Sequence, residues 1–306
     1  MNLLGIDIGG TKIAGGVVNA HDGTVLLRDR VATGAAEGGA AVLERALGLA
    51  RTLLDTARAQ GIDEPTAVGV GAGGQIDPET GVVVSATDLL PGWAGTPLRD
   101  AFEEGLDRDA FVDNDVNALA VGECRFGAGA GVRHLLFLAL GTGVGGAVVL
   151  DGRLHHGARG VGGELGHLLL FPDGGDYVTL EDYASGAALV RHYRALGGEE
   201  NWDGVAVGAA AKSDPGSVAA RAVARTGECL GIGLASLANI FDPDRFVIGG
   251  GLLDLGDLLL EPARRVLAER ALPLVRDTPV VPAALGADAA VIGAACLALS
   301  PRPEME

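Results

Sequence analysis

The chain has 306 residues, enough for two domains of ordinary size. Because 48% of the residues are hydrophobic and only 4% aromatic, the composition excludes a disordered or solenoid chain and indicates a core of small aliphatic side chains. The formal net charge of −17 excludes a broad surface for nucleic acid or an anionic membrane, although backbone amides can still hold a small anion. Three widely spaced cysteines suggest no disulfide framework, and no apolar run is long enough to span a bilayer, so a cytoplasmic location is predicted.

Hydrophobic patterning predicts strands and helices in alternation. In the first half we expect strands at 3–8, 13–18, 24–28, 67–70 and 110–112, and helices at 39–60, 96–106 and 116–126. In the second half we expect strands at 135–140, 147–150, 245–248 and 280–282, and helices at 180–196, 217–240, 256–271 and 288–299. This order, with hairpins near the start, predicts an α/β class with mixed sheets.

A short internal repeat supports two similar halves. Residues 3–18 and 135–150 share the order buried strand, glycine turn, strand, and a hairpin turn follows each copy. One such repeat in a chain of this length indicates two lobes of common design.

Three glycine loops that follow buried strands are candidates for binding phosphate. They are Gly9-Gly10-Thr11-Lys12, Gly141 to Gly146, and Gly249-Gly250-Gly251. Glycine lets the backbone approach an oxygen closely and leaves amide donors uncovered, although such loops can also be tight turns and nothing more. The GxGxxG patterns at 69–74 and 141–146 lack the following helix that a dinucleotide site requires, and no GxxxxGK[ST] sequence occurs.

Seven segments follow one another along the chain: Asp7 to Lys12, Ser85 to Leu98, Asn114 to Ala118, Leu140 to Gly146, Gly163 to His167, Leu180 to Gly186 and Ile248 to Gly251. In this order they resemble the motifs of the ROK family of sugar kinases and sugar-responsive repressors, within the actin/hexokinase superfamily. The resemblance extends over essentially the whole chain. Repressors of the family carry a helix-turn-helix domain before the first motif, whereas six residues precede Asp7 here, so we expect the kinase branch.

The resemblance implies an actin-like ATPase (ribonuclease H-like/hexokinase) fold, with two lobes of mixed β-sheets and a nucleotide cleft between them. We expect a smaller lobe from residues 1–115 plus about 286–306, and a larger lobe from 116–285. The implied reaction is ATP-dependent phosphorylation of a hexose hydroxyl, converting glucose or a close relative to the 6-phosphate with Mg²⁺. An amino or N-acyl sugar, fructose or a sugar-like cyclitol is an alternative substrate, and a non-catalytic sugar-sensing regulator is an alternative class. The resemblance also implies a homodimer or homotetramer.

Phosphoryl transfer to an alcohol needs a base near the hydroxyl and charge neutralisation at the phosphates. Asp115 is the predicted base, at the start of a helix whose positive end should keep it ionised, although it could serve only as a helix cap. Asp7 is predicted to hold Mg²⁺ through water, or else to stabilise a turn. The predicted ATP-binding residues are Gly9, Gly10, Thr11, Lys12, Gly141, Thr142, Gly143, Gly249, Gly250 and Gly251. Lys12 could equally pair with an acidic side chain.

The resemblance also implies a set of sugar contacts. They are Asn114, Glu164, His167, Glu181 and Gly74. Many relatives bind zinc between the equivalent of His167 and a cysteine-rich segment, but residues 168–180 contain no cysteine, so we predict no zinc. We interpret Asp113, His155, His156 and Arg159 as structural or solvated.

Overall fold

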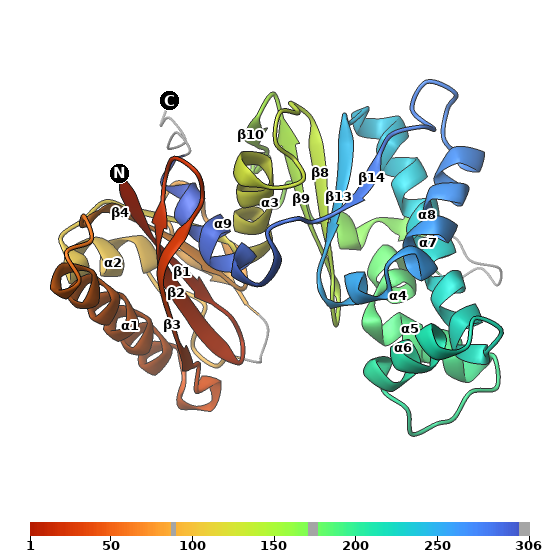
Figure 1. Ribbon diagram of the computed structural model, residues 1–306, viewed down its shortest axis with the longest axis horizontal. Helices are drawn as coiled ribbons and strands as arrows, with labels where there is room; N and C mark the ends of the chain where they lie inside the picture. The colour runs from red at the N-terminus through yellow and green to blue at the C-terminus, as the bar shows by residue number, and fades with distance from the viewer. Residues whose placement is uncertain (87–89, 171–176, 300–306) are drawn as a thin grey trace. The chain divides into compact units, whose positions relative to one another are not determined.

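The computed structural model of the chain describes residues 1–86, 90–170 and 177–299. Within these residues the chain forms two compact units. Unit 1 contains residues 1–131, 153–162 and the part from 284 onward, and unit 2 contains residues 132–152 and 163–283. Figure 1 shows the elements of each unit in colour order along the chain.

The sheet of unit 1 has the strand order β3-β2-β1-β4-β7. Its strands are β1 (Asn2–Ile8), β2 (Lys12–Asn19), β3 (Val25–Ala32), β4 (Pro65–Ala72) and β7 (Ala110–Asn114). The two hairpins make β1, β2 and β3 antiparallel, whereas β1, β4 and β7 run parallel because helices connect them. The carboxyl ends of β1, β4 and β7 therefore lie at one edge of the sheet.

Helices cover both faces of this sheet. Alternate residues of β1, among them Leu4 and Ile6, pack in one core with α1 (Gly39–Ala59) and α2 (Leu98–Leu106). The opposite face packs against α9 (Ala289–Leu297), which lies beside α3 (Asp115–Phe126) in Figure 1. Gly5 and Gly69 lie so close to the α9 backbone that a Cβ atom on either would overlap it. These glycines therefore let the helix lie directly on the sheet.

The second sheet, whose strands belong to unit 2 except for β10, repeats this plan in the order β10-β9-β8-β13-β14. Its strands are β8 (Leu135–Leu140), β9 (Val144–Leu150), β10 (Arg153–Leu154), β13 (Arg245–Gly249) and β14 (Val280–Pro282). The helices of unit 2 are α4 (Leu180–Ala184), α5 (Gly186–Ala195), α6 (Gly204–Ser213), α7 (Val218–Phe241) and α8 (Asp257–Arg270).

The structure also contains two short strand pairs, β5 (Gln75–Ile76) with β6 (Val83–Ser85) in unit 1, and β11 (Leu169–Leu170) with β12 (Val178–Thr179) in unit 2. The matching strand orders confirm that the sequence repeat marks two units of common design.

The helices of unit 2 differ from the expected ones in two places. The helix expected over 180–196 is interrupted at Ser185, whose backbone is extended and whose hydroxyl oxygen accepts from the Ala188 N–H at 3.1 Å, so that α5 begins as a separate helix. Helix α6 was not predicted, because its Gly- and Ala-rich sequence shows no clear apolar period.

The division of the chain also differs from the predicted boundary at residue 115. Helix α3 belongs to unit 1, because it packs on α9 through the close approach of Gly122 to Gly293. Residues 153–162 also belong to unit 1, although the chain on both sides of them belongs to unit 2.

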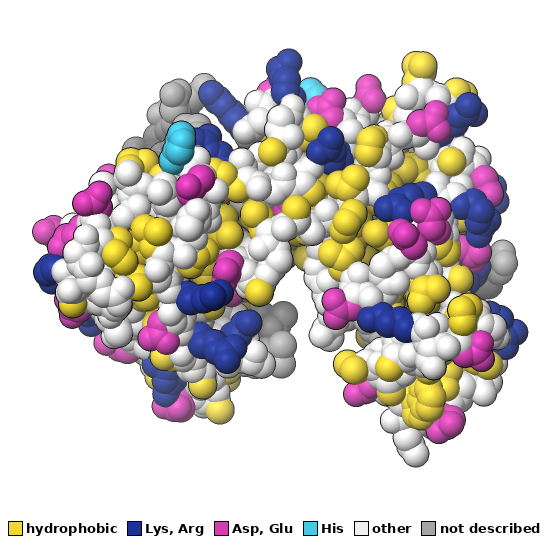
Figure 2. All heavy atoms as spheres, in the orientation of Figure 1, with side chains coloured by type: hydrophobic (Ala, Val, Ile, Leu, Met, Phe, Trp, Pro, Cys, Tyr) yellow, Lys and Arg dark blue, Asp and Glu magenta, His cyan; other side chains and the backbone are white. Residues whose placement is uncertain are grey.

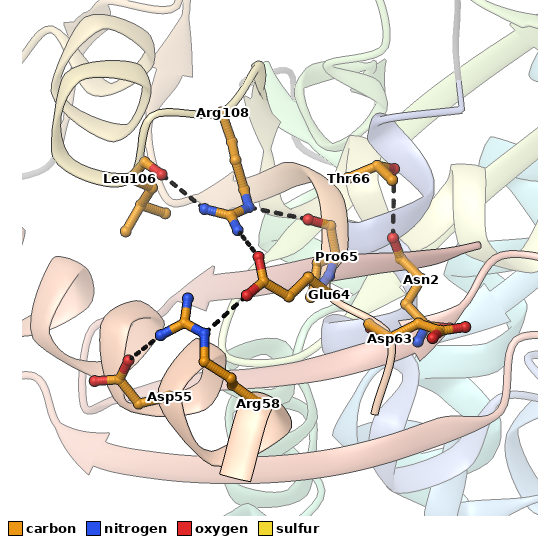
Figure 3. Close-up of polar contacts among 9 residues, drawn as sticks. All are labelled: Asn2, Asp55, Arg58, Asp63, Glu64, Pro65, Thr66, Leu106 and Arg108. Atoms are coloured by element: carbon orange, nitrogen blue, oxygen red, sulfur yellow. Dashed lines mark hydrogen bonds and ion pairs between the residues drawn. The ribbon is translucent and has the colours of Figure 1, made fainter. Parts of the chain in front are cut away.

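A polar network holds the end of unit 1 where β4 begins (Figure 3). Glu64 accepts from Arg58 at 2.9 Å and from Arg108 at 2.7 Å, and Arg108 also donates to the carbonyls of Pro65 and Leu106. The network joins the end of α1 to the turn between α2 and β7. Exposed ion pairs contribute about 1 kcal/mol or less each, so the ion pairs of this network add little to the stability of the fold.

The surface carries charges of both signs. On the face shown in Figure 2, Lys and Arg side chains are interspersed with Asp and Glu rather than gathered into one basic patch. None of the helices in the described part of the chain has the length and apolar character needed to span a bilayer.

Candidate active site

Two of the predicted site carboxylates, Asp7 and Asp115, both lie close to Gly71. Asp7 on β1 is in register with Gly71 on the parallel strand β4, and Asp115 is the first residue of α3 directly after β7. A Cβ atom added to Gly71 would lie 3.8 Å from Asp7 Oδ1 and 3.6 Å from Asp115 Cα. The fold thus brings together the predicted magnesium residue and the predicted base.

Burial changes the acidity of both carboxyls. Burial, and then the negative charge of Asp115, raises the pKa of Asp7 from 3.8 to about 6, against a smaller lowering by Lys12. Burial also raises the pKa of Asp115, although the Val116 N–H and the Asn114 side chain favour its ionised form. The sequence predicted that the helix terminus would dominate at Asp115, whereas in the structure burial outweighs it. Both groups therefore hold a proton more tightly than a free aspartate does.

Two of the predicted sugar contacts, Asn114 and Gly74, are hydrogen-bonded to each other. Its Nδ2 donates to the Gly74 carbonyl at 2.9 Å, and its Oδ1 caps α3 by accepting from the N–H groups of Val116 at 2.8 Å and Asn117 at 3.4 Å. Buried Trp93 donates from Nε1 to the Gly73 carbonyl at 3.0 Å. The predicted residues Asn114 and Gly74 are therefore brought into contact.

Thr33, a residue that the sequence analysis did not select, holds the first glycine loop by hydrogen bonds. Thr33, which is fully buried, donates from its hydroxyl to the Gly9 carbonyl at 2.6 Å and from its N–H to the Thr11 carbonyl at 3.1 Å. Gly10, Thr11 and Lys12 are exposed, and apart from the two chain neighbours of Gly10 no atom of the described residues lies within 4 Å of a Cβ placed on it. The loop is therefore fixed through its carbonyls of Gly9 and Thr11, while its residues Gly10 to Lys12 stay accessible to a ligand on the outer side of the loop. No spacing in the sequence distinguishes Thr33 from other threonines.

The second glycine loop is held by Glu181 and Gly186. The Glu181 carboxylate accepts from the Val144 N–H at 2.9 Å, and the Gly186 N–H donates to the Gly141 carbonyl at 2.8 Å. Exposed Thr142 lies at the outer end of this loop. The structure thus brings Glu181, predicted as a sugar contact, against the loop predicted to bind phosphate.

The remaining predicted residues of unit 2 follow two other strands. Glu164 precedes a short 3-10 helix (Leu165–His167) and His167 ends it, and both are exposed, while Gly166 within that helix lies against the backbone of β9. Gly249, Gly250 and Gly251 follow β13, and Gly250 has a φ of 88°. A side chain on Gly250 would also overlap the backbone of Leu140, so this position requires glycine.

The predicted site residues divide between the two units. Unit 1 contains Asp7, Gly9, Gly10, Thr11, Lys12, Gly74, Asn114 and Asp115. Unit 2 contains Gly141, Thr142, Gly143, Glu164, His167, Glu181, Gly249, Gly250 and Gly251.

The carboxylates of unit 1 suit a hard divalent cation. Mg²⁺ prefers oxygen ligands and is commonly held by one or two carboxylates together with substrate phosphates. A cation beside Asp7 would offset both the burial and the repulsion from Asp115 that raise its pKa. Asp7 therefore fits a Mg²⁺ site.

The predicted absence of zinc stays a prediction. Within residues 1–86, 90–170 and 177–299, no three His, Cys, Asp or Glu side chains gather into a group that could hold a metal. Residues 171–176 of the segment that follows His167, and residues 87–89 of the segment 85–98, lie outside the described part.

Comparison with known proteins identifies the family. The model of the ROK family matches residues 3–300. The chain belongs to the ROK family. The glucokinase of Streptomyces coelicolor is 36% identical to this ROK chain over 327 residues, covering 99% of both proteins.

Solved ROK structures agree with the fold. The ROK hexokinase from Thermus thermophilus is 37% identical and covers 97% of each chain, with a TM-score of 0.80. The ROK family glucokinase from Streptomyces griseus, in complex with glucose and AMPPNP, is 34% identical, with a TM-score of 0.78, and the match covers 97% of this chain and 99% of that one. These neighbours and the two mixed sheets confirm the predicted actin-like ATPase fold.

Proposed function

We propose that this ROK chain is an ATP-dependent glucokinase that transfers the γ-phosphoryl group of ATP to the 6-hydroxyl of glucose. The observation that carries the proposal is the pair of carboxylates, Asp7 and Asp115, which both lie close to Gly71 at the carboxyl ends of parallel strands. The similarity to glucokinases over the full length supports glucose as the acceptor.

In the proposed mechanism Asp115 is the general base. The hydroxyl oxygen of the sugar attacks the γ-phosphorus in line while its proton passes to the Asp115 carboxylate. The bond from the γ-phosphorus to the bridging oxygen breaks, and ADP leaves. The raised pKa of Asp115 makes its carboxylate a stronger base than a free aspartate.

The nucleotide is assigned to the glycine loops. Gly9, Gly10, Thr11, Lys12, Gly141, Thr142 and Gly143 would bind the phosphates, and Gly249, Gly250 and Gly251 the adenosine. The exposed outer side of the first loop and the fixed backbone of the second support this assignment. Asp7 would hold Mg²⁺ through water, and the cation would neutralise charge on the phosphates.

The sugar is assigned to Asn114, Gly74, Glu164, His167 and Glu181. These residues offer both donors and acceptors, as recognition of neighbouring hydroxyls requires. We also propose that the protein works in the cytoplasm as a homodimer or homotetramer, which light scattering on the purified protein would test.

The test is a coupled assay of ADP release with glucose, mannose, fructose, N-acetylglucosamine, N-acetylmannosamine and inositol. We expect the highest kcat/KM with glucose, and phosphorus NMR should show the 6-phosphate. Asp115→Ala should lower kcat by about 10²–10⁴-fold with little effect on ATP affinity. Asp55→Ala, an exposed change on α1, is the matched control. Sugar binding without turnover of any sugar would instead favour a sugar-sensing regulator.

A further inference from the structure

A second carboxylate, Asp113, lies buried just before the proposed base. It is the fourth residue of β7 and is 7% exposed. Its Oδ1 accepts from the Asn114 N–H at 2.7 Å and from Asn117 Nδ2 at 2.8 Å. Asn114 and Asn117 lie on either side of Asp115 in the sequence, so Asp113 defines the turn where β7 ends and α3 begins.

The other oxygen of Asp113 faces a histidine. Oδ2 lies 2.7 Å from His156 Nε2, and both side chains are largely buried. A carboxylate oxygen accepts a hydrogen bond, so the contact is a hydrogen bond when Nε2 carries the proton. Asp113 is thus held from both sides, by the amides of the catalytic turn and by the imidazole.

His156 begins a loop that a backbone hydrogen bond closes. The His156 carbonyl accepts from the Gly162 N–H at 2.7 Å, closing a loop over residues 156–162. Gly163 and Glu164 follow directly. This segment packs in unit 1, with Gly160 close to the carbonyl of Ile76. The contact with Asp113 therefore fixes the segment at a point eight residues before Glu164.

We propose that Asp113 and His156 form a positioning pair that sets the orientation of Asp115 for proton transfer. This proposal rests on the proposed kinase function. With both oxygens engaged, the Asp113 carboxylate cannot rotate without breaking its bonds to Asn114 and Asn117. A general base must lie within hydrogen-bond reach of the proton it takes, and a displacement of about 1 Å can cost about 10²-fold in rate. The pair acts on Asp115 through the backbone and does not touch the substrate.

The test compares neighbouring histidines. His156→Leu removes the donor to Asp113, His156→Gln retains an N–H donor, and His155→Leu is the matched control because His155 is exposed. We expect His156→Leu to lower kcat by about tenfold or more, with the ATP KM changed by less than about threefold. His156→Gln should recover most of this loss, and His155→Leu should behave as the wild type.

A double-mutant cycle sharpens the test. In an Asp113→Asn background, His156→Leu should cost clearly less than it does alone, because the bond it removes is already weakened. Equal losses in both backgrounds would show that the two residues act independently and would overturn the proposal. Equal kcat values for His156→Leu and the wild type would overturn it as well.

A measurement that does not depend on turnover separates this proposal from the proposed function. Amide hydrogen exchange of the peptide that contains Asn114 to Asn117 should quicken in His156→Leu but not in His155→Leu. If the wild type phosphorylates no sugar, the proposed function fails, whereas the exchange comparison still decides whether His156 holds the turn. Unchanged exchange in His156→Leu would refute the positioning role.

Discussion

Replacing Asp7 with asparagine should stabilise the ligand-free protein while it destroys the proposed magnesium site. Asp7 lies buried beside Asp115, and burial together with that charge raises the pKa of Asp7 to about 6. The folded protein therefore binds this proton more tightly than the unfolded chain does, so its stability falls as the pH rises from 3.8 through about 6. Asparagine is nearly isosteric with aspartate and cannot ionise, so Asp7→Asn should remove this loss.

The size of the effect follows from the pKa. Moving a carboxyl from 3.8 to about 6 costs the folded state about 3 kcal/mol once the group is fully ionised. For a protein of this size, that corresponds to a rise in Tm on the order of 5–10 °C at pH 7.5. At pH 5 the advantage of the variant should be about half as large, and it should vanish only near about pH 3, where Asp7 is neutral in the folded and in the unfolded chain.

The assay is thermal unfolding in the presence of EDTA at pH 7.5 and pH 5, with Asp63→Asn as the control. Asp63 is an exposed carboxylate of the same unit, so its replacement should leave Tm almost unchanged at both pH values. The same Asp7→Asn preparation should show turnover reduced by at least about 10²-fold, since an amide is a poor partner for Mg²⁺. A variant that is no more stable than the wild type at pH 7.5, or whose advantage grows at pH 5, would refute the reasoning.

Three further outcomes are expected. Glu123 is fully buried and accepts hydrogen bonds from the N–H groups of Ala284 at 2.9 Å and Leu285 at 3.0 Å. Glu123→Ala should therefore lower the free energy of unfolding by about 3–5 kcal/mol. A Tm lowered by less than about 2 °C in thermal unfolding would contradict this. A methyl group on Gly143 would overlap the Glu181 carboxylate and displace this proposed sugar contact. In steady-state kinetics, Gly143→Ala should therefore raise the KM for sugar by about tenfold and the KM for ATP by less. Metal analysis of the purified protein should find no zinc, and one zinc per chain would overturn that prediction.

Much of the fold follows from local pattern. Strands with an apolar period, such as β1 and β8, end in glycine turns, and their repetition predicted two sheets of the same design. Helix α7 was placed within a residue at each end, because its long apolar stripe is unambiguous. The interruption at Ser185 was missed, since a serine cap within a helical pattern differs little from a serine on the surface of a helix.

The residues that hold the site were harder to predict than those expected to act in it. Asp7 and Asp115 belong to recognisable motifs, whereas Thr33 supports the first glycine loop through a contact between segments 24 residues apart in sequence. The contact between Asp113 and His156 spans 43 residues and depends on the packing of a whole segment. The raised pKa of Asp115 was missed for the same reason, because burial is set by the entire fold.

The position of α9 in the chain has a consequence for biosynthesis. The helix lies on Gly5 and Gly69, yet it is translated after all the strands of both sheets. Until it leaves the ribosome, the part of the first sheet that α9 covers stays exposed, while residues 163–283 can already be complete. The nascent first unit would therefore expose apolar surface during most of translation, and a chaperone that binds such surface would act on it before α9 arrives.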